Sequence, residues 1–275
     1  MNVHRLDVEG LSVVIEGEGP VVVFLHGWPD SPALWDGLVA SLRGRWTCVR
    51  LALPGFDLSR PPRPVSVDEM CRLLAVVVDA VSPGAPVTLV LHDWGCFFGY
   101  EYAARHVDRV VRVVGVDIGD SNSGAYLKGL TAREKLLIAG YQLWLATAWK
   151  LGAWWPSLAD RLTRFMARQV GCRTDPAAIG WQMNYPYAMQ WFGSYGGLRG
   201  VARVHKVFGP RIPILFCYGR RKPFMFHSQP WVESLDNMPG SAARGFDAGH
   251  WLMRQQPAEF AQVVSAWLDR SREAA

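Results

Sequence analysis

Short apolar runs alternate with helical segments over residues 1–119. Runs rich in β-branched residues predict strands, and apolar residues repeated every three to four positions predict helices. The expected strands cover residues 11–15, 21–25, 46–51, 87–91 and 110–116, and the expected helices cover residues 35–42, 67–81 and 96–105. Because strands and helices alternate, the pattern predicts a mostly parallel α/β sheet flanked by helices.

The alternation stops between residues 120 and 205. This segment has no convincing strand, several helical patterns and six of the thirteen tryptophans. Strand character returns at residues 212–218, and a final amphipathic helix is expected at residues 257–268. The pattern therefore predicts a helical cap at residues 120–205, inserted into an α/β core formed by residues 1–119 and 206–275.

Composition and charge narrow the class of protein. Hydrophobic residues make up 50% of the 275 residues and charged residues 19%, which excludes a disordered or fibrous chain. The net charge is +5, but the basic residues are scattered, and the one basic run, Arg220-Arg221-Lys222, is expected in a solvated loop. Because no basic stripe is present in the sequence, we do not expect a nucleic-acid partner.

The sequence carries no clear targeting or membrane signal. The first residues lack the apolar segment of a secretory signal, and the five cysteines lack metal-ligand spacing, so we expect a cytoplasmic protein with reduced thiols and no metal. Residues 136–155 are long enough to span a bilayer and contain one charged residue, Lys150. Lys150, Gln142 and Thr147 disfavour a transmembrane helix. A buried or lid helix is expected there, with contact at a membrane surface as the alternative.

The most informative segment for chemistry is residues 87–96, VTLVLHDWGC. A buried strand runs directly into a helix, and Asp93 lies at the turn between them. This arrangement is that of a nucleophile elbow, in which strain holds a side chain above the helix N-terminus. The helix N-terminus favours an ionised carboxylate. The alternative is that Asp93 merely caps the helix, as aspartate often does.

Two further residues complete a possible catalytic triad. Asp117 ends the strand that follows the elbow helix, and His250 precedes the last helix in the sequence AGHW. The order nucleophile, acid, histidine is the order found in α/β-hydrolases. Singly, Asp117 is compatible with a strand-end cap and His250 with a packed loop histidine. Asp120 and Asp247 are the reserve candidates for the acid.

The segment His26-Gly27-Trp28-Pro29 follows the expected strand at residues 21–25. In this architecture, the loop at that position supplies the second donor of the oxyanion hole. The backbone N–H groups of Trp28 and Trp94 are therefore the expected donors. Together with Asp93, the four residues of this segment and Trp94 are expected to form the oxyanion hole and the substrate pocket.

The chain resembles the α/β-hydrolase superfamily, and within it the aspartate-nucleophile branch of epoxide hydrolases and haloalkane dehalogenases. The motifs HGWP and HDWG, the helical cap and the AGHW loop carry this resemblance over nearly the whole chain. An acid at Asp117 is similar to that of many dehalogenases. Many epoxide hydrolases place it later, but residues 218–224 here contain no carboxylate. Leu91 also replaces the small residue usual two positions before the nucleophile.

A carboxylate nucleophile restricts the chemistry. It attacks an sp3 carbon that bears a leaving group and forms an alkyl-enzyme ester. His250, oriented by Asp117, would then activate the water that hydrolyses the ester. The expected partners are a small apolar substrate and water, and neither a metal nor an organic cofactor is needed.

Epoxide opening also needs an acid, which the resemblance assigns to cap tyrosines. The segment at Tyr141, YQL, is similar to the family segment that carries the first tyrosine. The second is expected near the end of the cap, where Tyr187 is preferred over Tyr185 by its position. The alternative for each tyrosine is an amphipathic cap residue at an apolar surface.

Halide release would need a cradle of N–H donors instead. Trp94 occupies the position that dehalogenases use, but Trp28 stands where many of them have asparagine. Enzymes that act on haloacids have arginines beside the elbow for the substrate carboxylate, whereas this chain has Phe97 and Phe98 there, which disfavours a haloacid substrate. We therefore predict hydrolysis of an apolar epoxide to a vicinal diol through an Asp93 ester. The alternatives are haloalkane dehalogenation with the same triad, another carbon–heteroatom hydrolysis, and a hydrolase-fold protein that binds a ligand without turnover.

Overall fold

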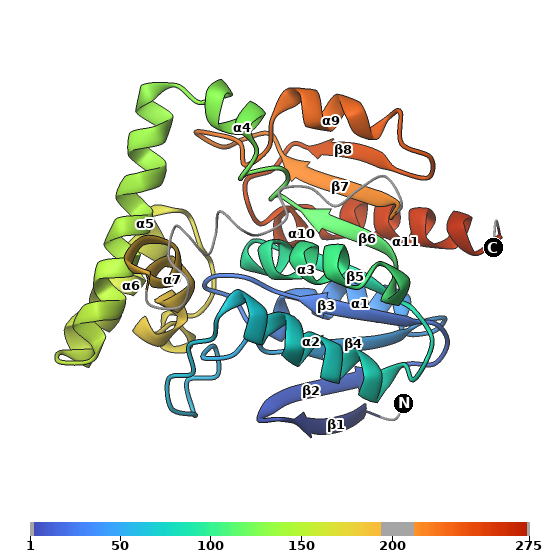
Figure 1. Ribbon diagram of the computed structural model, residues 1–275, viewed down its shortest axis with the longest axis horizontal. Helices are drawn as coiled ribbons and strands as arrows, with labels where there is room; N and C mark the ends of the chain where they lie inside the picture. The colour runs from blue at the N-terminus through green and yellow to red at the C-terminus, as the bar shows by residue number, and fades with distance from the viewer. Residues whose placement is uncertain (1–2, 194–211, 274–275) are drawn as a thin grey trace.

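A single mixed sheet forms the centre of the molecule (Figure 1). The structure is a computed structural model that describes residues 3–193 and 212–273. Within these residues the strand order is β1-β2-β4-β3-β5-β6-β7-β8, with β1 and β2 antiparallel to their neighbours and the later pairs parallel. The strands are β1 (Val3–Val8), β2 (Leu11–Glu16), β3 (Val21–Leu25), β4 (Thr47–Leu51), β5 (Val87–His92), β6 (Val110–Val116), β7 (Ile214–Gly219) and β8 (Ala242–Phe246).

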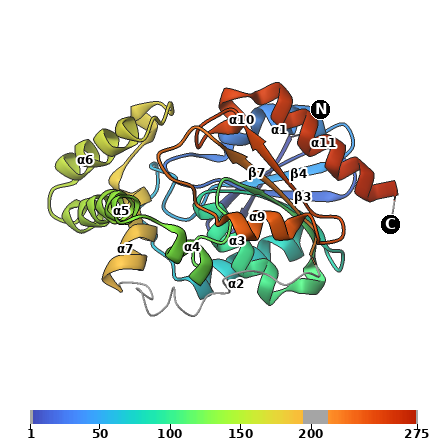
Figure 2. The same cartoon turned by 90° about the horizontal axis from the view of Figure 1, so that it is seen from above.

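Helices cover both faces of this sheet (Figure 2). Helices α2 (Val67–Val81), α3 (Trp94–Arg105) and α9 (Gln229–Leu235) pack on one face, and α1 (Asp36–Leu42), α10 (Leu252–Gln255) and α11 (Pro257–Glu273) pack on the other. The central strands are therefore apolar at consecutive positions, because neighbouring side chains enter opposite cores. In β5, Leu89 and Leu91 join the α2–α3 side, whereas Val90 joins the α1–α11 side.

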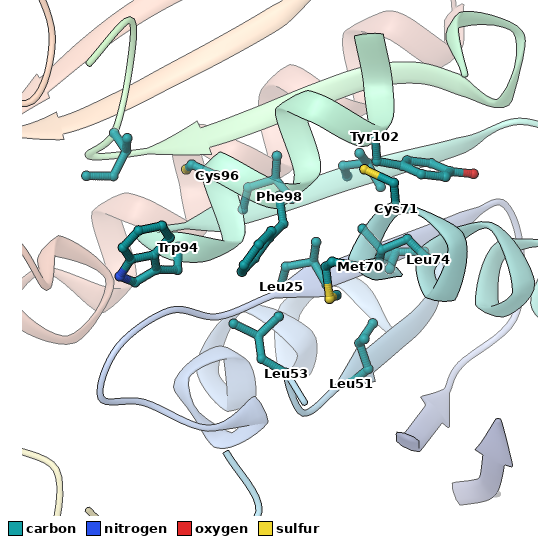
Figure 3. Packing of buried hydrophobic residues seen from close by; sticks show 14 of the residues in the cluster. Leu25, Leu51, Leu53, Met70, Cys71, Leu74, Trp94, Cys96, Phe98 and Tyr102 are labelled. Atoms are coloured by element: carbon teal, nitrogen blue, oxygen red, sulfur yellow. The ribbon is translucent and has the colours of Figure 1, made fainter. Parts of the chain in front are cut away.

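The core beside the elbow is built from side chains of several elements. Phe98 and Tyr102 of α3 and Met70 of α2 lie with Leu25 of β3 in one buried cluster (Figure 3). These four side chains are almost fully buried. At about 25 cal/mol per Å² of apolar area, burial of each stabilises the fold by roughly 1.5–3 kcal/mol. This packing holds the start of α3 against the ends of β3 and β5.

The segment between β6 and β7 is helical where it is described. It contains α4 (Gly124–Gly129), α5 (Ala132–Gly152), α6 (Pro156–Gln169) and α7 (Tyr185–Phe192). Helix α5 begins with a capping box, in which Thr131 and Glu134 satisfy each other's backbone N–H groups. Of the helices in the described ranges, none has the length and apolar character needed to cross a bilayer. The predicted end of the cap at residue 205 lies outside the described residues.

Most predicted elements are present with bounds shifted by a few residues. The predicted helix at 96–105 is wrong at its start, because α3 begins at Trp94, directly after Asp93. Strands β1 and β8 and helix α9 were not predicted. Strand β1 is almost wholly exposed, and β8 contains Arg244 and Gly245, so neither shows the apolar run expected of a buried strand.

Candidate active site

The turn between β5 and α3 holds Asp93 in a strained conformation. Its backbone has φ 52° and ψ −122°, a positive φ that few non-glycine residues adopt. Gly27 permits the close approach of the β3 loop, since a Cβ there would clash with the Asp93 side chain. Leu91, the larger residue noted in the sequence, is accommodated because the facing residue on α3 is Gly99.

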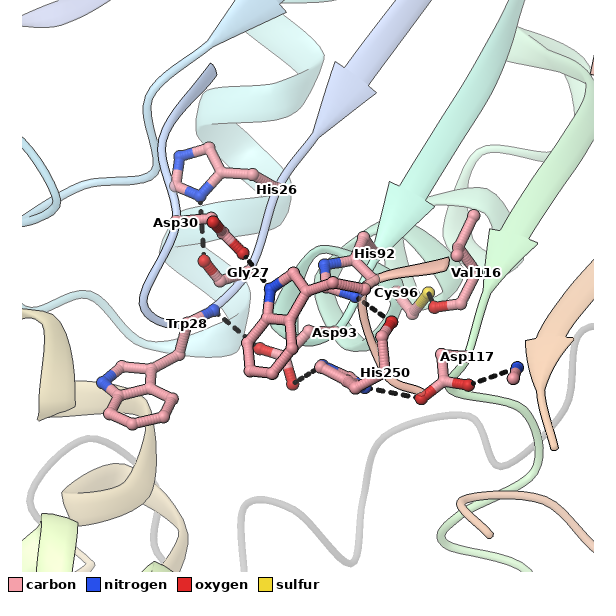
Figure 4. A network of polar contacts seen from close by, with 12 residues as sticks. His26, Gly27, Trp28, Asp30, His92, Asp93, Cys96, Val116, Asp117 and His250 are labelled. Atoms are coloured by element: carbon pink, nitrogen blue, oxygen red, sulfur yellow. Dashed lines mark hydrogen bonds and ion pairs between the residues drawn. The ribbon is translucent and has the colours of Figure 1, made fainter. Parts of the chain in front are cut away.

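Asp93, His250 and Asp117 lie in contact in the loops that follow β5, β8 and β6 (Figure 4). The Nε2 atom of His250 is 3.6 Å from Oδ2 of Asp93, and its Nδ1 is 2.5 Å from Oδ2 of Asp117. In the neutral imidazole, an Nδ1–H bond to Asp117 leaves Nε2 unprotonated and facing Asp93. This is the arrangement of a nucleophile, a general base and an orienting acid.

The reserve acids occupy other environments. Asp120 accepts hydrogen bonds from the backbone and hydroxyl of Ser228, at 2.6 and 2.7 Å. Asp247 is exposed and pairs with Arg221 at 3.2 Å. Neither carboxylate is bonded to His250 in the described part of the chain, so the geometry favours Asp117.

Lys222 is part of this cluster, which corrects the expectation that the basic run lies wholly in a solvated loop. Its Nζ contacts Oδ1 of Asp117, and its side chain is 5% exposed. Arg220 and Arg221 are exposed. Lys222 lies in the loop after β7, the place where the sequence showed no carboxylate. The position of this loop could have indicated Lys222, because β7 pairs with β6, the strand that Asp117 follows.

Burial and charge act against each other in this cluster. Burial alone would raise the pKa of Asp117, but Lys222 and the hydrogen bond from His250 hold it well below its usual value. Burial lowers the pKa of His250, but Asp117 and Asp93 outweigh burial and raise that pKa above its usual value. Lys222 opposes this rise. For Asp93, burial raises the pKa, and His250 and two backbone N–H groups lower it. Burial is the larger effect, so the pKa of Asp93 lies above its usual value.

Both predicted oxyanion donors are hydrogen-bonded to the Asp93 carboxylate. The backbone N–H of Trp28 donates to Oδ1 at 2.7 Å, and the backbone N–H of Trp94 also donates to the carboxylate. His26, Gly27 and Pro29, which were predicted to line the pocket, line neither cavity described below. His26 is fully buried, and its Nε2 accepts the Leu53 N–H at 3.1 Å. It therefore fixes the loop rather than contacting a ligand.

Two cavities meet at Asp93. One has a volume of about 380 Å³ and the other about 460 Å³. Asp93, Tyr141, Tyr187 and Phe226 line both of them. Trp94 lines the first, and Trp28 and His250 line the second. The two cap tyrosines therefore lie at the junction of the cavities, beside the carboxylate.

The two tyrosines are close enough to influence each other. Their ring centroids are 6.0 Å apart, and the amide of Gln142 donates to the Tyr141 hydroxyl at 3.3 Å. Burial raises the pKa of both hydroxyls well above the usual value, and the charge of Asp93 raises both further. Both hydroxyls therefore stay protonated at neutral pH and can act as donors.

Tyr185, the other candidate, lies elsewhere. It is fully buried and packs against Phe56 and Trp149, at centroid distances of 6.2 Å each. Its hydroxyl has no hydrogen-bond partner among the residues that the structure describes. It lines neither cavity, so of the two candidates Tyr187 is the one beside Asp93.

Two hydrogen bonds join the cap to the β3 loop. Asn184 accepts the Trp28 indole N–H at 2.8 Å, and the Thr174 hydroxyl donates to Asp30 at 2.8 Å. Asp30 also accepts the Trp251 indole N–H at 2.6 Å, next to His250. The sequence did not indicate Asn184, Thr174 or Asp30, because the partners are widely separated along the chain, Trp28 and Asn184 by 156 positions.

Comparison with protein families agrees with this geometry. Residues 20–253 match the model of a family described as alpha/beta hydrolase fold. A solved structure of an epoxide hydrolase from Bacillus megaterium superposes with a TM-score of 0.71 at 19% identity, covering 97% of this chain and all of the other. At that identity the likeness shows the fold. The predicted fold class is confirmed.

The curated relatives that match this chain are named for different activities. A probable oxidoreductase EphD of Mycobacterium tuberculosis is 40% identical over 100 residues, which are 34% of this chain and 17% of that protein. The chain thus matches less than a fifth of that relative. A cis-3-alkyl-4-alkyloxetan-2-one decarboxylase of Shewanella oneidensis is 27% identical, covering 91% of this chain and 83% of the relative. A haloalkane dehalogenase of Mycolicibacterium smegmatis is 34% identical, covering 40% and 37%. The resemblance that the motifs indicated is confirmed.

Proposed function

The chain belongs to the α/β-hydrolase family, and on that basis we propose that it is an enzyme that hydrolyses apolar epoxides to vicinal diols through a covalent ester on Asp93. The observation that carries this proposal is the position of Tyr141 and Tyr187. Both line the same two cavities as Asp93. A nucleophile and two hydroxyl donors at one point suit the opening of a ring whose oxygen must be protonated.

In the first step, a carboxylate oxygen of Asp93 attacks one carbon of the epoxide. The carbon–oxygen bond breaks, and the oxygen takes a proton from a cap tyrosine. A buried alkoxide without a donor would be costly, so the tyrosine hydroxyls stabilise the transition state where charge develops. The product of this step is an ester between Asp93 and the substrate, with a free hydroxyl on the neighbouring carbon.

In the second step, His250 removes a proton from water, and the water oxygen attacks the Cγ atom of Asp93. The negative charge develops on Oδ1, which accepts the backbone N–H of Trp28, and the backbone N–H of Trp94 also donates to this carboxylate. Each such donor contributes about 3–4 kcal/mol to transition-state stabilisation. The bond between Cγ and the ester oxygen then breaks, and that oxygen takes the proton held by His250 to complete the diol. The second proton of the water passes to the tyrosinate, so Asp93 is again an ionised carboxylate and the tyrosine is restored.

Haloalkane dehalogenation uses the same triad but needs N–H donors for the halide. The Trp28 indole N–H donates to Asn184 at 2.8 Å, so it is not free to bind a halide without rearrangement. This contact favours an oxygen leaving group over a halide.

A second candidate is the opening of a β-lactone. The Shewanella relative, whose match covers 91% of this chain, is named for decarboxylation of a cis-dialkyl oxetan-2-one. That ring is also strained and also has an oxygen leaving group on an sp3 carbon. Asp93 could displace that oxygen in the same way. The leaving group would be a carboxylate, which the cap tyrosines would hydrogen-bond rather than protonate.

One substrate screen tests these candidates. Purified protein is incubated with an aryl epoxide, a primary bromoalkane and a cis-dialkyl β-lactone, and diol, bromide and carbon dioxide are measured. Diol formation that is lost in Asp93→Asn is the expected result. Bromide release or lactone decarboxylation without diol formation would replace the proposal with the corresponding alternative.

A further inference from the structure

The outer helices of the cap expose an unusual number of large apolar side chains. Trp154 is 80% exposed and Trp155 61% exposed, at the turn between α5 and α6. This helical pair forms the side of the cap far from α11 (Figures 1 and 2). An exposed apolar patch of this kind marks an interaction site more often than a solvated surface.

The patch continues along both helices. On α6, Leu158 and Phe165 are exposed and alternate with the exposed Arg161 and Arg168 at helical spacing. On α5, Trp144 is exposed and packs against Phe165 at a centroid distance of 5.7 Å. We call the surface formed by Trp144, Trp154, Trp155, Leu158 and Phe165 the cap outer face.

The charge of the chain is concentrated in the same part of the sequence. Residues 124–192 contain eight basic and three acidic residues, a net charge of +5. The remaining residues contain 21 basic and 21 acidic residues, so the whole excess positive charge belongs to the cap. A second copy of this chain would bring like charge against this surface, whereas an anionic surface complements it.

The cap outer face also adjoins a cavity that reaches the catalytic carboxylate. Leu137 and Val170 are 43% and 40% exposed, and both line the cavity that contains His250. Leu137 precedes Trp144 on α5 by seven residues, two helical turns along the same side. An apolar molecule leaving a lipid layer at this face would therefore enter the cavity without crossing water.

We infer that the cap outer face binds the surface of an anionic phospholipid bilayer. Trp154 and Trp155 would enter the headgroup region, where indole rings are favoured because one edge is apolar and one is polar. Arg161 and Arg168 would contact the phosphate groups. The bilayer is then both the docking surface and the phase from which an apolar substrate reaches Asp93.

Vesicle flotation tests this inference with the full chain. Vesicles of phosphatidylcholine with about 30% phosphatidylglycerol are compared with pure phosphatidylcholine at low salt and at roughly 0.5 M NaCl. We expect about ten-fold stronger partitioning to the anionic vesicles, and loss of that difference at high salt. The double variant Trp154→Ser/Trp155→Ser should lower partitioning by roughly ten-fold or more. Arg161→Glu/Arg168→Glu should do the same at low salt.

Matched variants on the core provide the controls. Val107→Ser/Val111→Ser removes two apolar side chains of 40% and 41% exposure, and Arg5→Glu/Arg220→Glu makes the same change in net charge as the cap pair. Both should partition like the wild type. Asp93→Asn should also bind normally, which separates this inference from the proposed reaction, and Trp154→Ser/Trp155→Ser should keep full activity on a water-soluble epoxide.

Three results would overturn the inference. One is wild-type protein that stays unbound at millimolar anionic lipid, and another is equal loss of binding in the core variants. The third is light scattering that shows a dimer in wild-type protein and a monomer in Trp154→Ser/Trp155→Ser, because the face would then pair with a second copy.

Discussion

At the scale of single residues, Lys222 changes the electrostatics of the triad. It contacts the oxygen of Asp117 that does not face His250, so both carboxylate oxygens of a fully buried acid are engaged. The backbone N–H of Gly219 adds a bond at 3.0 Å to the same oxygen as Lys222. The lysine thus fixes the orientation of Asp117, keeps it ionised, and weakens its pull on the proton of His250.

Replacing Lys222 by methionine should therefore shift the pH dependence of turnover. His250 must be neutral to accept a proton from water, so activity falls as pH drops through its pKa. The charged groups and the imidazole that face His250 are Asp93, Asp117, His92 and Lys222. Without Lys222 the net charge around His250 is more negative, and its pKa rises. We expect the acidic limb of the kcat–pH profile to move up by about 1 pH unit.

Two further variants make this result interpretable. Lys222→Arg keeps the charge and should restore the wild-type limb, whereas Arg221→Met removes an exposed neighbouring charge and should leave the limb unchanged. Thermal melts establish whether Lys222→Met is folded, since breaking a buried ion pair costs about 3–5 kcal/mol. A folded Lys222→Met with an unchanged acidic limb would contradict this role.

At the scale of elements, the sequence predicted what local periodicity controls. Strand β5 and the start of α3 were placed closely enough to single out Asp93, because a buried β-branched run followed by an aromatic helix is a strong local signal. Strand β8 was missed because its apolar character is weak and its place comes from pairing with β7. Edge strands are specified by their neighbours more than by their own residues.

The cap illustrates the same limit. The sequence indicated helices between residues 120 and 205, but it did not give their arrangement over the core. It favoured Tyr187 over Tyr185 by position along the chain, and the distinction is three-dimensional. Tyr187 faces Asp93 from α7, whereas Tyr185, two residues earlier, turns toward Phe56 and Trp149. A shift of two residues on a helix rotates a side chain by about 200°, to the other side of the axis.

Tyr185 provides a matched control for the roles of Tyr141 and Tyr187. Tyr141→Phe should lower epoxide turnover by roughly ten-fold or more, and Tyr141→Phe/Tyr187→Phe should nearly abolish it, because no hydroxyl remains to protonate the ring oxygen. Tyr185→Phe should be indistinguishable from wild type. Initial rates of diol formation measure all three. Full activity in the double variant would mean that neither hydroxyl is the acid.

At the scale of the whole molecule, the fold brings distant segments to one edge of the sheet. The parallel strands β3, β5, β6 and β7 end at the same edge, where the loops that follow them carry Trp28, Asp93, Asp117 and Lys222. Sequence reasoning reached three of these four through chain order and motif spacing. It could not reach Lys222 or Asn184, because their partners are defined only by the assembled sheet and cap.

The proposed reaction depends on a covalent ester that Asp93 forms and His250 then releases. His250→Gln should form the ester but fail to hydrolyse it, since glutamine cannot take a proton from water. The decisive measurement is intact mass spectrometry of this variant after incubation with an epoxide that the wild type converts. We expect a mass gain of one substrate per chain, located by peptide mapping on Asp93 and absent from Asp93→Asn/His250→Gln. A folded His250→Gln that shows no adduct, or an adduct on another residue, would contradict it.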